Sequence, residues 1–201
     1  MSFGGIHPDN NNYREILRNL AEHNTPGVKL HPVFQQINFD DIRYLRIIEC
    51  ACENNLIILA HAGYDASFPG ADFAAPVRIR HVYDHIQPDK LVLAHMGGWD
   101  CFDEAREVLA GCKVYLDTAY TLSPMRSENG DIVATEQYKP MSREQFMRFV
   151  KICGADHILF GSDSPWTDIK ESMELVRESG LNPTEIKAIL GGNAARLLNL
   201  I

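Results

Sequence analysis

Three side chains that can bind a metal or move a proton follow three apolar segments of the chain. They are His61 in LIILAHAG, His95 in KLVLAHMGG and Asp163 in HILFGSDSPW. Short apolar runs bounded by turn residues are typical of strands that are buried on both faces of a parallel sheet. Polar groups at the carboxyl ends of such strands lie over a pocket. The sequence therefore predicts that these three side chains meet at one site.

His61 and Asp163 are the two predicted ligands of a divalent metal ion, for which zinc is the expected identity. A catalytic zinc ion takes three protein ligands from histidine and carboxylate side chains and keeps one position open for water. The third ligand could be His95, or His31, which is two residues from Lys29 and so points to the same side of its strand. Such an ion lowers the pKa of its water to about 7 and makes hydroxide available.

The same side chains have predicted roles in proton transfer. Asp163 would accept the proton of the water, and His95 would act as an acid or stabilise developing charge, because imidazole changes protonation near neutral pH. Asp163 and His95 are therefore the predicted catalytic residues. The structural alternatives are histidines that bond to backbone carbonyls, and an aspartate that caps the helix expected after Pro165.

Two further residues are predicted to bind the substrate. Lys29 lies inside the apolar run GVKLHP, where an unpaired ammonium would be costly, so it could bind a substrate carboxylate or form a structural salt bridge. Trp166 could form a wall of the pocket or pack against the adjacent loop. We take the substrate-binding alternative for both.

The elements that would position these residues alternate along the chain. The predicted strands lie at 3–8, 27–32, 56–63, 90–98, 113–120 and 157–166. The predicted helices lie at 13–23, 41–54, 76–86, 99–109, 142–154, 168–178, 184–190 and from 193 onward. The helices carry apolar residues at the spacing of one face. Ser142 with Gln145 forms a capping box, and Asn193 is a predicted N-cap. We predict a single α/β domain over 1–201, a parallel (β/α) barrel of TIM type with about six strand–helix units visible.

Loop lengths indicate which end of this barrel carries the chemistry. Links from helices to strands are short, whereas the links that leave strands include 64–75 and 122–141. Long loops in compact domains are usually functional or disordered. The segment 124–142 could be a lid over the pocket or a loosely held excursion.

Composition excludes several classes of partner. The 201 residues carry a net charge of −8, which disfavours nucleic acids and anionic membranes, so a small-molecule substrate is expected. There is no apolar run of membrane-spanning length and no recognisable leader, so the cytoplasm is the expected location.

The five cysteines form no disulfide framework and are expected to be reduced. His81 and His85 have helical i, i+4 spacing, but without the glutamate of a zincin motif we expect an outer helix.

The ordered set GVKLHP, LAHAG, LAHMGG, LDTAY, GSDSPW and GGNAARLLNL resembles the amidohydrolase superfamily, specifically the amidohydrolase-related branch that includes aminocarboxymuconate-semialdehyde decarboxylase. The resemblance covers nearly the whole chain and implies a (β/α)8 barrel with a divalent metal, usually zinc, at the carboxyl end. By position, His61 resembles the metal-binding histidine of strand five, His95 the catalytic histidine of strand six, and Asp163 the aspartate of strand eight. In some members the lysine equivalent to Lys29 is carboxylated and bridges two metals.

The chain also departs from this family pattern. The visible strands resemble the family's third to eighth, and the His-x-His pair that strand one normally supplies is absent. Either sequence is missing before residue 1, or this is a natural short form with an altered site. We expect missing sequence or an alternative start, because the remaining strand ends retain catalytic residue types.

The predicted function is a metal-dependent hydrolase that acts on a small carboxylated or cyclic substrate. Non-oxidative decarboxylation of a small aromatic or unsaturated acid is the alternative, because the same site can activate water or stabilise a carbanion. A third possibility is a non-catalytic barrel remnant that binds a ligand or pairs through exposed sheet edges. A homo-oligomer is expected.

Overall fold

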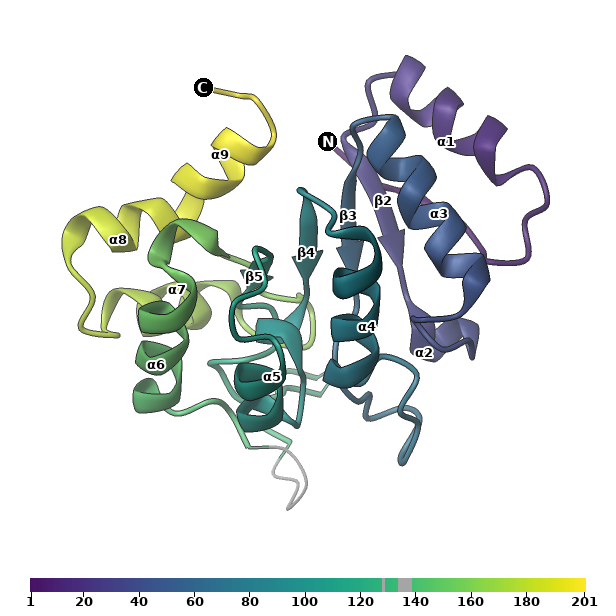
Figure 1. Ribbon diagram of the computed structural model, residues 1–201. Coiled ribbons are helices and arrows are strands. Elements are labelled where there is room, and N and C mark those ends of the chain that lie inside the picture. The colour runs from purple at the N-terminus through teal and green to yellow at the C-terminus, as the bar shows by residue number, and fades with distance from the viewer. Residues whose placement is uncertain (128, 134–138) are drawn as a thin grey trace.

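The computed structural model describes residues 1–127, 129–133 and 139–201. Within these ranges, a single sheet contains β1 (Gly4–Gly5), β2 (Gly27–Leu30), β3 (Ile57–Ala60), β4 (Leu91–Leu93), β5 (Tyr115–Asp117) and β6 (Ile158–Leu159). Neighbours in the sheet are neighbours in the sequence, and every pair is parallel. A parallel sheet in sequence order with helical connections is the arrangement of a (β/α) barrel. The predicted fold of six strand–helix units is confirmed (Figure 1).

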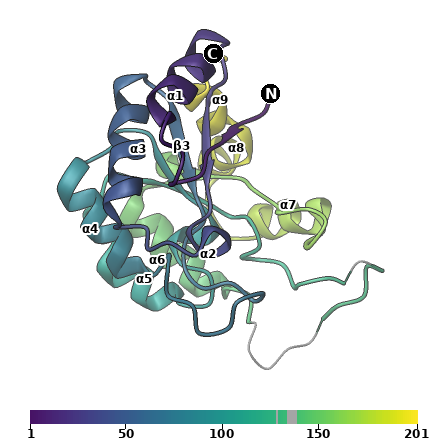
Figure 2. The ribbon, with the colours of Figure 1, turned by 90° about the vertical axis from the view of Figure 1, so that its right-hand side faces the viewer.

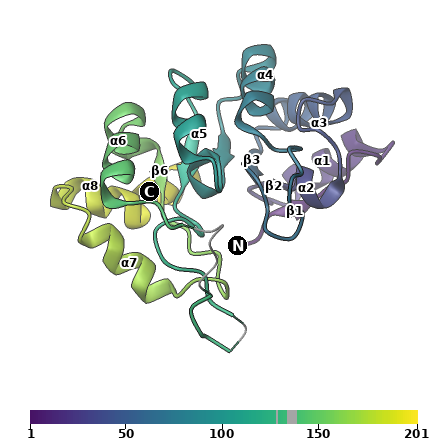
Figure 3. The same cartoon turned by 90° about the horizontal axis from the view of Figure 1, so that it is seen from below.

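The helices lie in the connections between the strands and after the last strand. They are α1 (Tyr13–Glu22), α2 (Pro32–Gln35), α3 (Ile42–Glu53), α4 (Pro76–Ile86), α5 (Phe102–Val108), α6 (Arg143–Cys153), α7 (Ile169–Arg177), α8 (Pro183–Lys187) and α9 (Asn193–Leu197), with the short turns η1 (His95–Gly97), η2 (Ala155–His157) and η3 (Ala188–Gly192). Figure 3 shows α3, α4, α5 and α6 following one another in an arc outside the strands. None of the helices that the structure describes is long and apolar enough to cross a bilayer.

The two faces of the sheet have different surroundings because side chains alternate along a strand. On the outer face, Val28, Ile58 and Leu91 are in register with one another and belong to the large core beneath the helices. On the inner face, Lys29, Leu59 and Val92 are in register. A smaller apolar cluster covers this face, with side chains from α9 packed against it. Lys29 is thus a charged residue on the inside of the barrel wall.

The long loops and the chain termini lie at opposite ends of the molecule (Figures 1 and 2). The loop after β3 and the loop after β5 extend from the carboxyl ends of their strands, as the loop lengths predicted. The suggested lid over 124–142 includes residues 128 and 134–138, which lie outside the described residues, so the lid stays a prediction.

Most predicted elements are confirmed, and the differences have local causes. Ser142 and Gln145 form the capping box of α6, and all five cysteines are free thiols. The strands are shorter than predicted, and α2 was not predicted. The prediction of Asn193 as an N-cap is wrong. The residue before it, Gly192, already has helical dihedral angles, so Asn193 is the first residue of α9 and its side chain donates instead to the carbonyls of Ala155 and Ile158.

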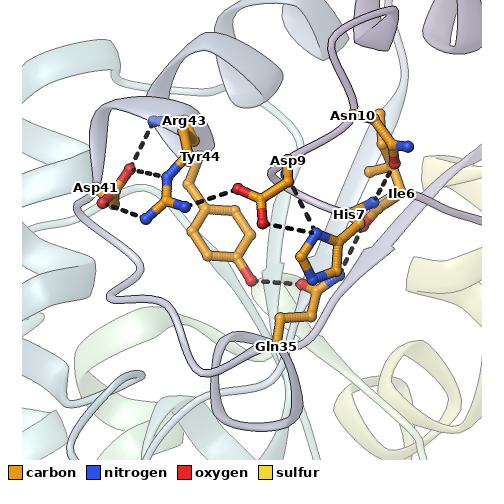
Figure 4. A network of polar contacts seen from close by, with 8 residues as sticks. All are labelled: Ile6, His7, Asp9, Asn10, Gln35, Asp41, Arg43 and Tyr44. Atoms are coloured by element: carbon orange, nitrogen blue, oxygen red, sulfur yellow. Dashed lines mark hydrogen bonds and ion pairs between the residues drawn. The ribbon is translucent and has the colours of Figure 1, made fainter.

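The start of α3 generates a prediction about stability and pH. The carboxylate of Asp41 accepts hydrogen bonds from the backbone and the guanidinium of Arg43, and Arg43 also donates to Asp9 in the loop after β1 (Figure 4). The hydrogen bond from the Arg43 side chain lowers the pKa of Asp41 to about 2. Replacing Asp41 with Ala should lower the free energy of unfolding by about 1 kcal/mol at pH 7, because a helix cap is lost.

Because the folded-state pKa lies below the unfolded value of about 3.9, this stabilisation is present above that value and disappears as the pH falls through about 2. Urea unfolding of both proteins between pH 7 and pH 2 measures the difference. Glu49→Ala, an exposed change within the same helix, is the matched control and should change stability little at either pH. A difference for Asp41→Ala that persists unchanged at pH 2 would contradict the assignment.

Candidate active site

A cavity of about 280 Å³ opens at the carboxyl ends of the strands. The residues predicted to form the site all line it: Lys29, His61, His95, Asp163 and Trp166. Its other lining residues include four aromatic side chains, Phe34, Tyr64, Trp99 and Tyr120, together with His31 and Asp65. The strand order brings these distant residues together, while the role of each remains a prediction.

His61 follows β3 directly, and hydrogen bonds fix its orientation. Its backbone N–H donates to the carbonyl of Leu30, and its side chain is buried, with 5% of the residue exposed. The ring atom Nε2 lies 2.9 Å from the carbonyl oxygen of Tyr64. A carbonyl oxygen accepts hydrogen bonds and cannot donate one, so Nε2 carries the hydrogen and Nδ1 presents a lone pair.

A glycine allows the loop after β3 to supply that carbonyl. Gly63 has a φ of +92°, and a Cβ added there would lie 2.2 Å from the backbone nitrogen of Trp99. The close approach lets Tyr64 N–H donate to the carbonyl of Trp99 at 3.0 Å. The loop is thereby held over the start of the next connection, and the Tyr64 carbonyl is held near His61.

His95 lies in η1, just after β4, with a φ of +58°. Its backbone N–H donates to the carboxylate of Asp117, which also accepts the N–H of Ala119. The ring atom Nδ1 lies 2.8 Å from the carbonyl oxygen of Ala119, so Nδ1 carries the hydrogen. Asp117 therefore acts on His95 by holding both its backbone and its carbonyl partner. Asp117 is not among the predicted site residues, and its contact with His95 depends on the η1 turn.

The unprotonated nitrogens of the two rings face each other. His95 Nε2 and His61 Nδ1 are 3.2 Å apart in a buried environment. Burial, together with the neighbouring rings of His95 and His31, keeps the pKa of His61 well below its ordinary value, so the ring stays neutral. Two lone pairs at this distance repel each other, and a cation bound to both nitrogens would remove that repulsion. Two nitrogens that ligate one zinc ion at about 2.0–2.1 Å in a tetrahedral arrangement are about 3.3 Å apart, so the pair fits a metal.

A second group of donor atoms lies beside this pair. Ligand atoms of His31, His61 and Asp65 all lie within 4.8 Å of one another, so this His–His–Asp group could hold a metal ion. The rings of His31 and His61 are stacked at 4.2 Å. However, His61 Nε2 already donates to Tyr64, and His31 Nδ1 accepts the N–H of Phe34 at 3.4 Å, which places the ring hydrogen of His31 on Nε2. The lone pairs of His61 and His95 are therefore the better prepared ligands.

Sequence reasoning did not identify Asp65. It lies four residues after His61, and its carboxylate is 3.9 Å from Nε2 of both His31 and His61. Ser67 N–H donates to the same carboxylate and orients it. The loop conformation brings it into the cavity, and no strand pattern predicts that conformation.

Asp163 reaches the cavity from the loop after β6, where its φ is +55°. It is exposed, and it is not part of the His–His–Asp group found among the described residues. The alternative role of a helix cap is excluded, because Asp168 caps α7 by accepting the N–H of Glu171. Trp166 is 44% exposed at the rim of the cavity.

A partly buried glutamine, Gln35, orients the segment that carries His31, and Figure 4 shows its contacts with Tyr44 and Ile6. The side-chain oxygen of Gln35 accepts hydrogen bonds from the hydroxyl of Tyr44 and, at 3.3 Å, from the backbone N–H of His31. Its amide nitrogen donates to the carbonyl of Ile6 at 2.8 Å. Gln35 therefore links the ends of β1 and β2 to α3 and holds the short helix α2 at the cavity.

His81 and His85 are exposed on α4, as expected for an outer helix. His81 Nδ1 lies 3.0 Å from the carboxylate of Asp40. Neither histidine belongs to the group of metal-binding atoms identified in the described ranges of the chain.

Comparison with known proteins agrees with this architecture. The family model described as amidohydrolase matches residues 3–200. No curated protein matches the chain. Among solved structures, an uncharacterised TIM-barrel protein from Bordetella bronchiseptica is 20% identical with a TM-score of 0.75, and the match covers 98% of this chain and 64% of that one.

Two decarboxylases are similar in structure. The match to 5-carboxyvanillate decarboxylase from Sphingomonas paucimobilis has 15% identity and a TM-score of 0.69 and covers 98% of this chain and 66% of that one. Dihydroxybenzoic acid decarboxylase from Polaromonas, solved with manganese and 2-nitroresorcinol, has 17% identity and a TM-score of 0.60, with 94% and 65% covered. The chain spans about two thirds of the length of these structures. At these identities the likeness shows a shared fold.

The facing lone pairs generate a prediction about metal content. His61→Ala and His95→Ala should each lower the metal content of the purified protein by about tenfold, because each removes one prepared ligand. His85→Ala, an exposed change on α4, is the matched control and should leave metal content unchanged. Plasma mass spectrometry measures the metal for each protein. Full stoichiometric metal in His61→Ala would contradict the assignment.

Proposed function

This chain belongs to the amidohydrolase family, and from that premise we propose that it is a metal-dependent enzyme that decarboxylates a small aromatic or unsaturated acid. The observation that supports this most is the pair of inward lone pairs on His61 and His95 within an aromatic-lined cavity. The fold it shares with two decarboxylases is consistent with the proposal.

His61 and His95 would hold the metal, with Asp163 as the further predicted ligand. A bound divalent cation supplies positive charge that stabilises the negative charge developing on the substrate. The Polaromonas structure contains bound manganese, so we propose a divalent metal for this chain, and zinc stays a prediction.

The chain's own residues would bind the ring and move the proton. Trp99 and Tyr120 are stacked 5.7 Å apart and, with Trp166, provide flat apolar surfaces for a ring. When the bond to the carboxyl carbon breaks and CO2 leaves, its electron pair stays on the substrate carbon, which then takes a proton. Asp163, at the exposed side of the cavity, would relay this proton from solvent to the substrate carbon.

Hydrolysis of a C–N or C–O bond in a small carboxylated or cyclic substrate is the second candidate. The position of Asp163 favours it, because an exposed carboxylate at the cavity can accept a proton from water. In that reaction His95 would stabilise the developing charge. The expectations of a homo-oligomer and a cytoplasmic location stay predictions, as does the alternative of a non-catalytic remnant.

The proposal predicts CO2 release that depends on Asp163. Metal-loaded protein should release CO2 from at least one acid in a panel of hydroxybenzoates and carboxyvanillates, and 2-nitroresorcinol should inhibit it. Asp163→Asn should lower kcat by about 10²–10⁴, the range for loss of a proton-transfer group. Asp168→Asn is the matched control, because Asn also caps helices and the residue lies in the same connection.

Other outcomes of that assay distinguish the candidates. Hydrolysis of cyclic esters or amides without CO2 release would replace the proposal with the second candidate. A metal-loaded protein without turnover in either assay would favour the non-catalytic remnant. Equal kcat in Asp163→Asn and the control would remove Asp163 from the reaction.

A further inference from the structure

Lys29 is a charged side chain on the inner face of β2 that the proposed reaction does not use. It is partly buried and lines the cavity. Burial lowers its pKa, and the carboxylates of Asp117 and Asp163 partly oppose that effect. Across the described parts of the chain, no hydrogen bond or ion pair within 4.0 Å reaches the Lys29 ammonium. An ammonium that faces a partly enclosed cavity in this way is stabilised when an anion binds to it.

The two nearby carboxylates have other roles. One oxygen of Asp117 already accepts the backbone N–H groups of His95 and Ala119. Asp163 is exposed, so solvent screens its charge. Neither carboxylate forms an ion pair within 4.0 Å of the Lys29 ammonium in the described residues. The ammonium is therefore available to a ligand in the cavity.

His31 presents a hydrogen-bond donor beside Lys29. The two residues are two positions apart along the strand and its extension, and both line the cavity. Phe34 N–H donates to His31 Nδ1, so the ring hydrogen is on Nε2. One ammonium and one neutral N–H match a carboxylate better than a doubly charged phosphate.

We propose that Lys29 and His31 bind a carboxylate of the substrate that is retained in the product. A salt bridge stabilises a carboxylate and would oppose its loss as CO2, since the charge leaves the group during that step. The group that reacts therefore lies near His61 and His95, and the anchored carboxylate is a second one. This inference rests on the proposed function and narrows the substrate to a small dicarboxylic acid with a flat ring or an unsaturated chain.

Binding of an unreactive diacid tests the proposal without relying on activity. Isothermal titration of the full-length purified protein, with its metal content measured in the same sample, compares isophthalate with benzoate. Wild type should bind isophthalate about tenfold more tightly, because its second carboxylate reaches Lys29 and His31. Lys29→Met should lower isophthalate affinity about tenfold and reduce the preference to below about twofold, with metal content unchanged.

Matched variants separate charge from packing. Lys151→Met, which removes an exposed charge on α6, should leave both affinities unchanged. Lys29→Arg restores the charge and should recover most of the isophthalate preference. His31→Leu should reduce the preference, and His31→Gln, which keeps an N–H donor, should reduce it less.

Two results would overturn the proposal: equal affinity of wild type for the two acids, or an unchanged isophthalate preference in Lys29→Met. Circular dichroism shows whether Lys29→Met folds. If it does not fold, the proposal is still tested by the relative affinity of wild type for isophthalate and benzoate and by the same measurement on Lys29→Arg. A protein that binds isophthalate as expected but shows no turnover would contradict the proposed reaction alone. Turnover of monocarboxylic acids with no diacid preference would contradict this inference alone.

Discussion

Two backbone carbonyl groups determine what the cavity can bind. The carbonyls of Tyr64 and Ala119 each accept one ring hydrogen, so the remaining nitrogens of His61 and His95 face each other without a hydrogen at 3.2 Å. Both histidines are about 5–6% exposed, so water cannot readily satisfy these lone pairs. A cation bound to both nitrogens would be favourable here. The proposed chemistry of the pocket follows from this arrangement.

The parallel sheet places these carbonyls beside the histidines. Because β3, β4 and β5 are adjacent and run in the same direction, their following loops meet at one end. Gly63 allows the loop after β3 to contact Trp99, and Asp117 at the end of β5 bonds to the backbone of His95. The histidine tautomers are therefore a consequence of strand order and loop contacts. A change at Gly63 or Asp117 would therefore alter the orientation of His61 or His95 through backbone contacts.

The sequence predicted the parts of this arrangement that depend on periodicity. Apolar runs located the strands, and the residue after each run placed His61 and His95 at the pocket. It could not predict Asp65, because a loop turn brings that carboxylate beside two imidazoles. The roles of Asp117 and Gln35 were missed for the same reason: each acts through backbone groups whose positions depend on η1 and α2. Ring tautomers cannot be read from residue types at all, since they follow from individual hydrogen bonds.

The distribution of positive charge in the cavity explains how one pocket can suit two reactions. In a chain with a net charge of −8, the cavity contains an ammonium at Lys29 and a place for a cation at His61 and His95. The proposed anchor at Lys29 would fix the orientation of the substrate, whichever group lies at the second position. If that group is a carboxylate, loss of CO2 leaves negative charge next to the cation. If it is an ester or amide, attack by water develops negative charge at the same place. The substrate, more than the protein, then decides which bond breaks.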